Sequence, residues 1–430
     1  MTVSTIDYDE RAKNTLGYSR WWQLVAAAVM MALVSPYQYA WSALEGPLAV
    51  RLDASLTVIG FVFTLYVVVM SVTQFPAGWY RDRHGPRLLI ILAGFFSGGG
   101  YLGTAVASHT WQLYVAYGLG AVGVGIVYTI AVNTAVKWFP DKRGLTTGVG
   151  TMAFGAGSAL FVPYIRANAS PEALPAALTL VGILVGVGVI AGGLLLRDPP
   201  EEFLHRTRST DTDNTTSEST NTGDESVVDE AKTIDGSRQY TWQETVRTWQ
   251  FWTMYVMFTL VATTGLMITA RVVLYAEELG LTALVATMAA TLLPIASGGG
   301  RLIVGGLSDR LQREHVMTGA FLICGLATVA IVGFGRIDAG IGYIVAVAVA
   351  VFFWSAQFSL FPSTVADYYG PKHSSSNYAL LYSSKMWGGV FGGGVSAWLV
   401  STIGWDAAFL LGAGLSIIAG LLGLILYPPE

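Results

Sequence analysis

Long apolar runs with few or no charged residues recur along this chain of 430 residues. A helix of about 20 residues crosses a hydrocarbon core ~30 Å thick, and the runs have about that length. Only 12% of the residues are charged, against about 25% in a typical soluble domain. We therefore expect an all-α integral membrane protein. The twelve predicted spans lie near residues 21–44, 57–80, 87–107, 111–136, 144–165, 175–196, 250–274, 282–306, 316–335, 340–362, 375–400 and 406–427.

The distribution of lysine and arginine over the predicted loops indicates an orientation. If both termini lie on one side, that side carries most of the 24 basic residues, and the opposite side carries Arg51, Arg166, Arg271 and Arg336. Cytoplasmic loops of membrane proteins are enriched in lysine and arginine. We therefore expect a multi-pass protein of the plasma membrane, in contact with the lipid bilayer, with both termini in the cytoplasm.

One polar stretch interrupts the series of spans. Residues 207–236 are rich in Ser, Thr, Asp and Glu and contain almost no large apolar side chains. Such a composition cannot bury enough apolar surface to fold alone. We expect an N-terminal six-helix bundle over 1–196, a disordered cytoplasmic linker over 197–247, and a C-terminal six-helix bundle over 248–430.

A short motif occurs in the corresponding loop of each half. It has a glycine, then an aspartate four residues later, then an arginine. Its members are Gly78, Asp82 and Arg83 in the first half, and Gly305, Asp309 and Arg310 in the second. Glycine allows two helices to approach closely, and an aspartate–arginine contact can hold neighbouring helices in one arrangement. We expect these six residues to take part in gating.

The twelve spans, their six-plus-six division, the long central loop and the repeated motif together resemble the major facilitator superfamily. The resemblance covers nearly the whole chain. It implies two pseudo-symmetric six-helix bundles that give alternating access to a site near the middle of the membrane.

Two basic residues, Arg301 and Lys385, fall inside predicted spans, and no acidic residue lies in the middle of any span. A cation at the bilayer centre costs at least ~2.5–3.5 kcal/mol on insertion scales. From the helix rise, Lys385 lies ~15 Å and Arg301 ~12 Å from the cytoplasmic loops. Two unpaired cations predict a site for an anion, and two charges favour a dianion. The alternative for Arg301 is that its long side chain extends to the membrane surface.

A closer resemblance rests on three segments, 297–310, 377–385 and 137–144. They are similar to the oxalate:formate antiporter branch, which is related to the monocarboxylate transporters. The resemblance implies a secondary transporter of small carboxylate anions. It also implies that Arg301 and Lys385 bind the carboxylates, the arginine in bidentate fashion and the lysine as a point charge.

The same branch surrounds its substrate with aromatic side chains. The candidates here lie on three predicted spans: Tyr37, Gln38, Tyr39 and Trp41, then Tyr128, then Trp354 and Phe358. For any single aromatic residue, packing or lipid contact explains its presence equally well. Phe358 has no hydroxyl group, so if the branch has tyrosine there, one hydrogen bond to oxalate is missing.

Features that the chain lacks narrow the function further. Animal monocarboxylate transporters place an aspartate one turn before the arginine of the eighth span, where this chain has Ser297. This difference favours oxalate/formate-type anion exchange over proton symport. The alternatives are a monocarboxylate transporter for lactate, pyruvate or formate, and a non-transporting sensor with the same fold.

Other function classes are disfavoured. The sequence has no phosphate-binding glycine loop and no cluster of histidine, cysteine or acidic residues at a span end. We therefore expect no enzyme activity, no cofactor, no metal and no nucleic-acid partner, and we expect that function does not require an oligomer.

Overall fold

The computed structural model describes residues 8–139, 143–200, 239–308, 310–370 and 373–429, and within these ranges it contains helices and no strands. The helices of the first half are α1 (Tyr8–Leu16), α2 (Trp21–Val34), α3 (Pro36–Tyr39), α4 (Trp41–Arg51), α5 (Leu56–His84), α6 (Arg87–Val106), α7 (Thr110–Lys137), α8 (Arg143–Ala156), η1 (Gly157–Leu160), α9 (Phe161–Ala167) and α10 (Leu174–Leu195). Those of the second half are α12 (Trp242–Thr245), α13 (Trp249–Glu278), α14 (Ala283–Ser308), α15 (Arg313–Arg336), α16 (Gly340–Ser355), α17 (Gln357–Tyr369), α18 (Ser374–Tyr382), α19 (Ser384–Val390), η2 (Phe391–Val395), α20 (Ser396–Ile403), α21 (Trp405–Leu422) and η3 (Gly423–Ile425).

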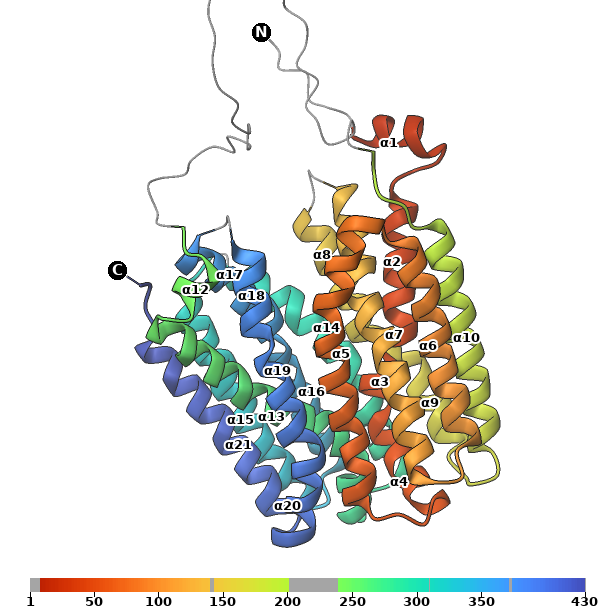
Figure 1. The fold of residues 1–430 in the computed structure, drawn as a ribbon. Helices are drawn as coiled ribbons and strands as arrows, with labels where there is room; N and C mark the ends of the chain where they lie inside the picture. Colours follow the sequence, from red (N-terminus) through yellow and green to blue (C-terminus); the bar gives the residue numbers. More distant parts are fainter. Residues whose placement is uncertain (1–7, 140–142, 201–238, 309, 371–372, 430) are drawn as a thin grey trace, which may run out of the picture.

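The membrane spans correspond closely to the apolar runs. Ten helices of the described residues are long and apolar enough to cross a membrane, and the bent pair Trp21–Tyr39 and Trp41–Arg51 forms an eleventh. The remaining expected span is divided into α18, α19, η2 and α20, which follow one another across the molecule (Figure 1). The segment η2 is a π-helical turn that contains three consecutive glycines, Gly392–Gly394.

Two span boundaries differ from the expected ones. The first span was expected to end at residue 44, but after a bend of 50° at Ala40 its helix continues to Arg51. The seventh was expected to end at residue 274, but α13 continues to Glu278. Glu45 therefore lies on a membrane-spanning helix, and Arg271 lies further from the end of its span than expected; both side chains are buried. The expectation that Arg301 and Lys385 are the only charges within the helical core is wrong.

The two halves of the chain lie side by side (Figure 1). Contacts between them are made by α5 with α19 and η2, by α8 and η1 with α14, and by α4 with α13. Small residues permit this approach: a Cβ on Gly155 of α8 would lie 2.9 Å from the backbone nitrogen of Gly298 in α14. The helices that carry Arg301 and Lys385 thus lie at the boundary between the halves.

Helices α2 and α13 begin, and helix α21 ends, at the same end of the molecule (Figure 1). Trp249, at the start of α13, packs against Tyr427 near the C-terminus, with ring centroids 5.0 Å apart. We call this end, where α2 begins and α21 ends, the terminal end (Figure 1). The opposite end, where α4, α13 and α20 finish, is called the far end.

The expected linker over 197–247 is too long at its C-terminal side. Residues 239–247 are part of the folded protein: the Tyr240 backbone nitrogen donates to the Tyr369 carbonyl at 2.9 Å, and Asn377 donates to the Tyr240 carbonyl at 3.1 Å. Thr241 and Glu244 form a capping box that starts α12. The segment 207–236, for which disorder is predicted, lies outside the described residues.

Candidate functional site

Arg301 and Lys385 both reach across the boundary between the two halves. Arg301 lies on α14, where its Nη1 donates to the Thr151 carbonyl at 3.1 Å and its Nη2 to the Tyr39 hydroxyl at 3.3 Å. Lys385 lies on α19, and its Nζ donates to Gln38 Oε1 at 3.4 Å. Arg301 is 5% exposed and Lys385 is 2% exposed. The Arg301 side chain therefore points to the other half of the protein instead of extending to the membrane surface.

Neither cation forms an ion pair with a carboxylate of the described residues, where the ion pairs involve other arginines and one other lysine. The ring of Phe358 on α17 lies near both cations. Arg301 Cζ lies 4.6 Å and Lys385 Nζ 5.4 Å from its centroid. Cation–π contacts of this kind contribute about 0.5–2 kcal/mol each, depending on desolvation. The sum of the two distances, 10.0 Å, is the largest separation that the two cationic atoms can have.

Tyr39 connects Arg301 to Ser297, which lies on the same helix as Arg301. The Tyr39 hydroxyl accepts from Arg301 and also forms a hydrogen bond of 2.7 Å with Ser297 Oγ, in which either hydroxyl can be the donor. Ser297 precedes Arg301 by one turn on α14, which places both on one face of the helix. The ring of Tyr39 packs against Phe154, and Tyr128 packs against the other edge of that phenylalanine, with centroids 5.9 and 5.1 Å away. These contacts fix the hydroxyl that positions the guanidinium.

The residues expected in the first span divide into two groups. Gln38 and Tyr39 face the cations, as described above. Tyr37 instead donates to the Ser97 carbonyl at 2.6 Å, and its ring packs against Tyr101 and Tyr117 within the first half. Trp41 also packs there, against Tyr117 with centroids 5.0 Å apart. The spacing agrees with the split, because Tyr37 and Trp41 are four residues apart and so lie on one side of the span. Tyr37 and Trp41 are thus packing residues in this structure.

Trp354 and Tyr128 lie at the edge of the site. Trp354 packs against Phe358 with centroids 5.6 Å apart, and a Cβ at Gly265 would overlap the Trp354 ring. Tyr128 lies close enough to Arg301 to interact with it electrostatically, as do Tyr378 and Tyr382. The Tyr382 hydroxyl also accepts from Lys385 Nζ at 3.3 Å. The spacing of Tyr382, three residues before Lys385, is a sequence signal that identifies it. Phe154 and Thr151 carry no such signal.

Several buried donors around the cations have no protein partner among the described residues. They are Arg301 Nε, Gln38 Nε2 and Trp354 Nε1. A buried donor without a partner costs about 1–3 kcal/mol. Donors together with two cations are suited to a ligand that only accepts hydrogen bonds, and an ionised carboxylate is such a ligand.

The expected gating residues are described only in part. A Cβ on Gly305 would lie 3.1 Å from Ser359, which indicates a close approach of α14 and α17, whereas a Cβ on Gly78 would make an ordinary contact of 3.6 Å with Thr129. Arg310 is exposed. Asp309 and the side chains of Asp82 and Arg83 lie outside what the structure describes, so their gating role stays a prediction.

Comparison with known proteins decides the family. The sequence profile of the Major Facilitator Superfamily matches residues 24–393. The chain belongs to the major facilitator superfamily. The fold agrees, because the D-xylose-proton symporter structure superposes with a TM-score of 0.72 at 12% identity, covering 95% of this chain and 98% of that one.

Two relatives bear on this major facilitator protein in particular. It is 32% identical to the oxalate:formate antiporter of Oxalobacter formigenes over 412 residues, which are 95% of this chain and 92% of that protein. It is 24% identical to the apicoplast pyruvate carrier 1 of Toxoplasma gondii, over 88% of this chain and 74% of that protein. These findings confirm a multi-pass membrane transporter, and they favour transport over the sensor alternative.

Proposed function

We propose that this transporter carries small carboxylate anions by alternating access, and that it exchanges a dicarboxylate such as oxalate for a monocarboxylate such as formate. The observation that carries the proposal is the pair Arg301 and Lys385. Both are buried at the boundary between the halves, and neither is paired with a described carboxylate. The similarity to the oxalate:formate antiporter of Oxalobacter formigenes agrees with this chemistry.

The separation of the two cations suits a short dicarboxylate. Their reference atoms are at most 10.0 Å apart. Charge-assisted hydrogen bonds are about 2.8 Å long, so a C2 dicarboxylate with roughly 3 Å between its outer oxygens spans about 9 Å between two donor nitrogens. One dianion can therefore contact both cations at once and cancel both charges.

The contacts of the cations also support alternating access. In this structure, Arg301 donates to Tyr39 and Thr151, and Lys385 donates to Gln38, so each cation of the second half uses acceptors of the first. A carboxylate ligand competes for the same donors. Binding and release of the anion would therefore change polar contacts that connect the two halves.

Exchange is favoured over proton symport at this site. Ser297, one turn before Arg301, has no titratable group and is occupied by Tyr39. Exchange of a dianion for a monoanion moves one net charge, which is coupled to the membrane potential by about 2.3 kcal/mol per 100 mV. The transport rate should therefore respond to an imposed potential.

A monocarboxylate transporter is the second candidate. It is favoured by the pyruvate-carrier relative and by Phe358, which brings no hydroxyl to the space between the cations. With a monocarboxylate bound, one of the two cations would remain without a counter-charge.

Counterflow in proteoliposomes tests both candidates. Vesicles loaded with unlabelled oxalate, formate, malonate, lactate or pyruvate are placed in labelled oxalate or, in a second series, in labelled pyruvate, and uptake is measured with the potential clamped at zero and at ±100 mV. We expect oxalate and formate to support uptake and the heteroexchange to depend on the potential. Uptake driven best by lactate or pyruvate would favour the second candidate, and no uptake with any of the five anions would contradict both.

A further inference from the structure

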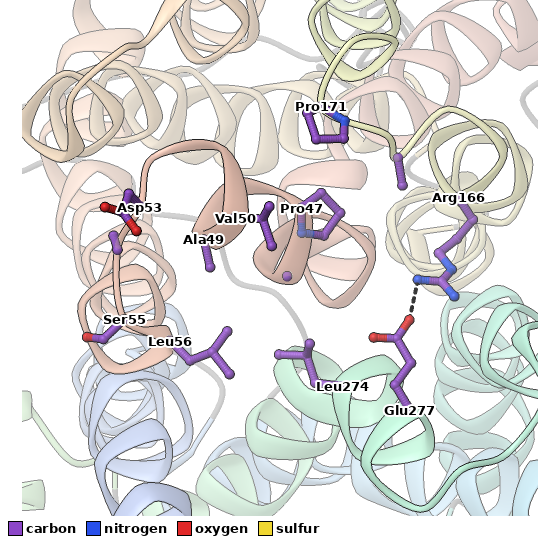
Figure 2. A pocket seen from close by; sticks show the side chains of 13 residues that line it. Pro47, Ala49, Val50, Asp53, Ser55, Leu56, Arg166, Pro171, Leu274 and Glu277 are labelled. Atoms are coloured by element: carbon purple, nitrogen blue, oxygen red, sulfur yellow. Dashed lines mark hydrogen bonds and ion pairs between the residues drawn. The ribbon is translucent and has the colours of Figure 1, made fainter.

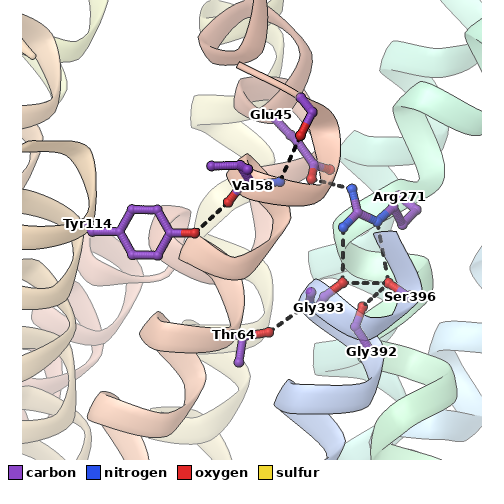
Figure 3. A network of polar contacts seen from close by, with 10 residues as sticks. Glu45, Val58, Thr64, Tyr114, Arg271, Gly392, Gly393 and Ser396 are labelled. Carbon is purple, nitrogen blue, oxygen red and sulfur yellow. Dashed lines mark hydrogen bonds and ion pairs between the residues drawn. The ribbon is translucent and has the colours of Figure 1, made fainter. Parts of the chain in front are cut away.

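A buried ion pair joins the two halves at a distance from the cations described above. Glu45 on α4 and Arg271 on α13 form this pair, with exposed fractions of 0% and 1% (Figure 3). Arg271 also donates to the Gly393 carbonyl at 3.0 Å and to Ser396 Oγ at 3.4 Å. One guanidinium thus connects the first span to the seventh and the eleventh.

A second polar contact between the halves lies beside the pair. Thr64 of α5 accepts from the Gly394 backbone nitrogen at 2.7 Å and donates to the Gly389 carbonyl at 3.0 Å. The backbone of α5 covers the ion pair, because a Cβ on Gly60 would overlap both Arg271 and Ala397. The contact of α4, α5, α13 and η2 is therefore closed to solvent.

A cavity of about 800 Å³ opens at the far end, directly next to this contact (Figure 2). Gly46 and Leu274 line it, one residue after Glu45 and three residues after Arg271. At its edge, Arg166 and Glu277 form a partly exposed ion pair at 2.8 Å. The cations Arg301 and Lys385 are not among its lining residues. Along the first span, Glu45 follows Gln38 and Tyr39, which contact the cations, and directly precedes Gly46, which lines the cavity. On this span the buried pair therefore lies between the central cations and the cavity.

We propose that the Glu45–Arg271 pair is the gate between the far-end cavity and the central site, and that it separates when the halves part at this end. The inference rests on alternating access but not on the identity of the substrate. The lysine and arginine distribution predicts that the far end faces the outside of the cell.

The chemistry of the pair suits two states. When the contact is dry, each charge depends on the other, because a buried charge without its partner is strongly destabilising. When the halves part, water from the cavity hydrates both groups and replaces the lost attraction. Glu45 Oε2 is buried and has no hydrogen-bond partner among the described residues, so the closed pair is incompletely satisfied and gains from hydration.

Thiol labelling tests the gate without any substrate. Cys324, the one cysteine of the chain, is buried and is first replaced by serine. Val67→Cys then provides a reporter one turn beyond Thr64 toward the cations, at a side chain that is 0% exposed and lies against Gly389. A membrane-impermeant maleimide is added at the far end. We expect Glu45→Gln to raise the labelling rate at least fivefold.

Glu277→Gln is the matched control. It makes the same chemical change at the other ion pair of α13 with the first half, where the glutamate side chain is 46% exposed. It should leave the labelling rate within twofold of the parent. Equal labelling of the parent and a folded Glu45→Gln protein would overturn the proposal.

A cross-link keeps the proposal testable if Glu45→Gln does not fold. A Cβ at Gly46 would lie 3.0 Å from Leu274 Cδ2, so the two positions face each other, and Gly46→Cys with Leu274→Cys is oxidised to form a disulfide across the gate. Exchange should fall at least tenfold on oxidation and return with reductant. Full exchange by the cross-linked protein would exclude the gate. Increased labelling of Glu45→Gln, together with no oxalate or formate exchange by the parent protein, would support the gate and contradict the proposed substrate.

Discussion

Replacing Lys385 by glutamine removes one buried cation and keeps a side chain of similar length. The ammonium lies 3.4 Å from Gln38 Oε1 and 3.3 Å from the Tyr382 hydroxyl, and both neutral partners can still bond an amide. Two unit charges 4 Å apart interact by about 4 kcal/mol at an effective dielectric constant of ~20. Desolvation offsets a large part of this. We take about 2 kcal/mol as the net loss for oxalate, which is roughly 30-fold in affinity.

Formate should lose less affinity than oxalate. Its single carboxylate can be held by the Arg301 fork, and Lys385 then acts from a greater distance. At ~8 Å the Coulomb energy at the same dielectric constant is about 2 kcal/mol before the desolvation cost is subtracted. We therefore expect formate to lose about 1 kcal/mol of binding free energy, which is roughly fivefold in affinity. Apparent affinities come from inhibition of labelled exchange by unlabelled anions. Lys385→Arg, which keeps the charge, and Tyr382→Phe, which removes one hydroxyl, are the controls.

The stability of the empty protein gives a second measurement on the same variant. Because an unpaired buried cation is unfavourable, Lys385→Gln should raise the melting temperature of the protein without substrate. The reasoning is refuted if oxalate and formate lose affinity equally, or if oxalate binds at parental affinity.

Three further substitutions test other parts of the proposal. Arg301→Lys keeps the charge but loses the planar fork, and should reduce oxalate exchange in proteoliposomes at least tenfold, with parental exchange as the contrary outcome. Phe358→Tyr brings a hydroxyl between the two cations, and one added hydrogen bond of about 1 kcal/mol should tighten oxalate binding roughly fivefold in competition assays; unchanged or weaker binding would show that the hydroxyl does not reach the anion. Asp82→Asn should change the exchange rate and the thiol accessibility of the terminal end while substrate affinity stays the same, and a variant with parental rate and accessibility would remove Asp82 from the gating residues.

The spans could be predicted from sequence because the bilayer constrains them strongly. Backbone groups in hydrocarbon must be satisfied within a helix, so each apolar run of sufficient length becomes a span. The prediction was less accurate at Glu45, which lies just beyond its apolar run, and at Arg271, which lies close to the expected end of its run; both are buried within the protein. The bend at Ala40 turns α4 so that Glu45 faces α13, and this geometry depends on the packing of the halves.

Within the site, side-chain direction limited the prediction. Arg301 and Lys385 were identifiable because charged residues inside apolar runs are rare. Gln38 and Tyr39 could not be separated from Tyr37 and Trp41, because the direction of each depends on a local break in the first span. Phe154, which packs between Tyr39 and Tyr128, is one of many apolar residues of its span, and only the tertiary packing identifies it.

The two sets of buried charges differ in a way that indicates different roles. The Arg271 guanidinium is matched by Glu45 and by two further acceptors of the eleventh span, so its positive charge has a counter-charge without a ligand. Arg301 and Lys385 are held by neutral acceptors and an aromatic ring, so neither has a counter-charge among the described residues and both are available to an incoming anion. Lys385 lies on the same broken span as Gly393 and Ser396, with the π-helical turn η2 following its helix. A shift of α19 toward a bound anion therefore acts on the span that Arg271 holds, which gives the substrate a direct physical connection to the far-end contact.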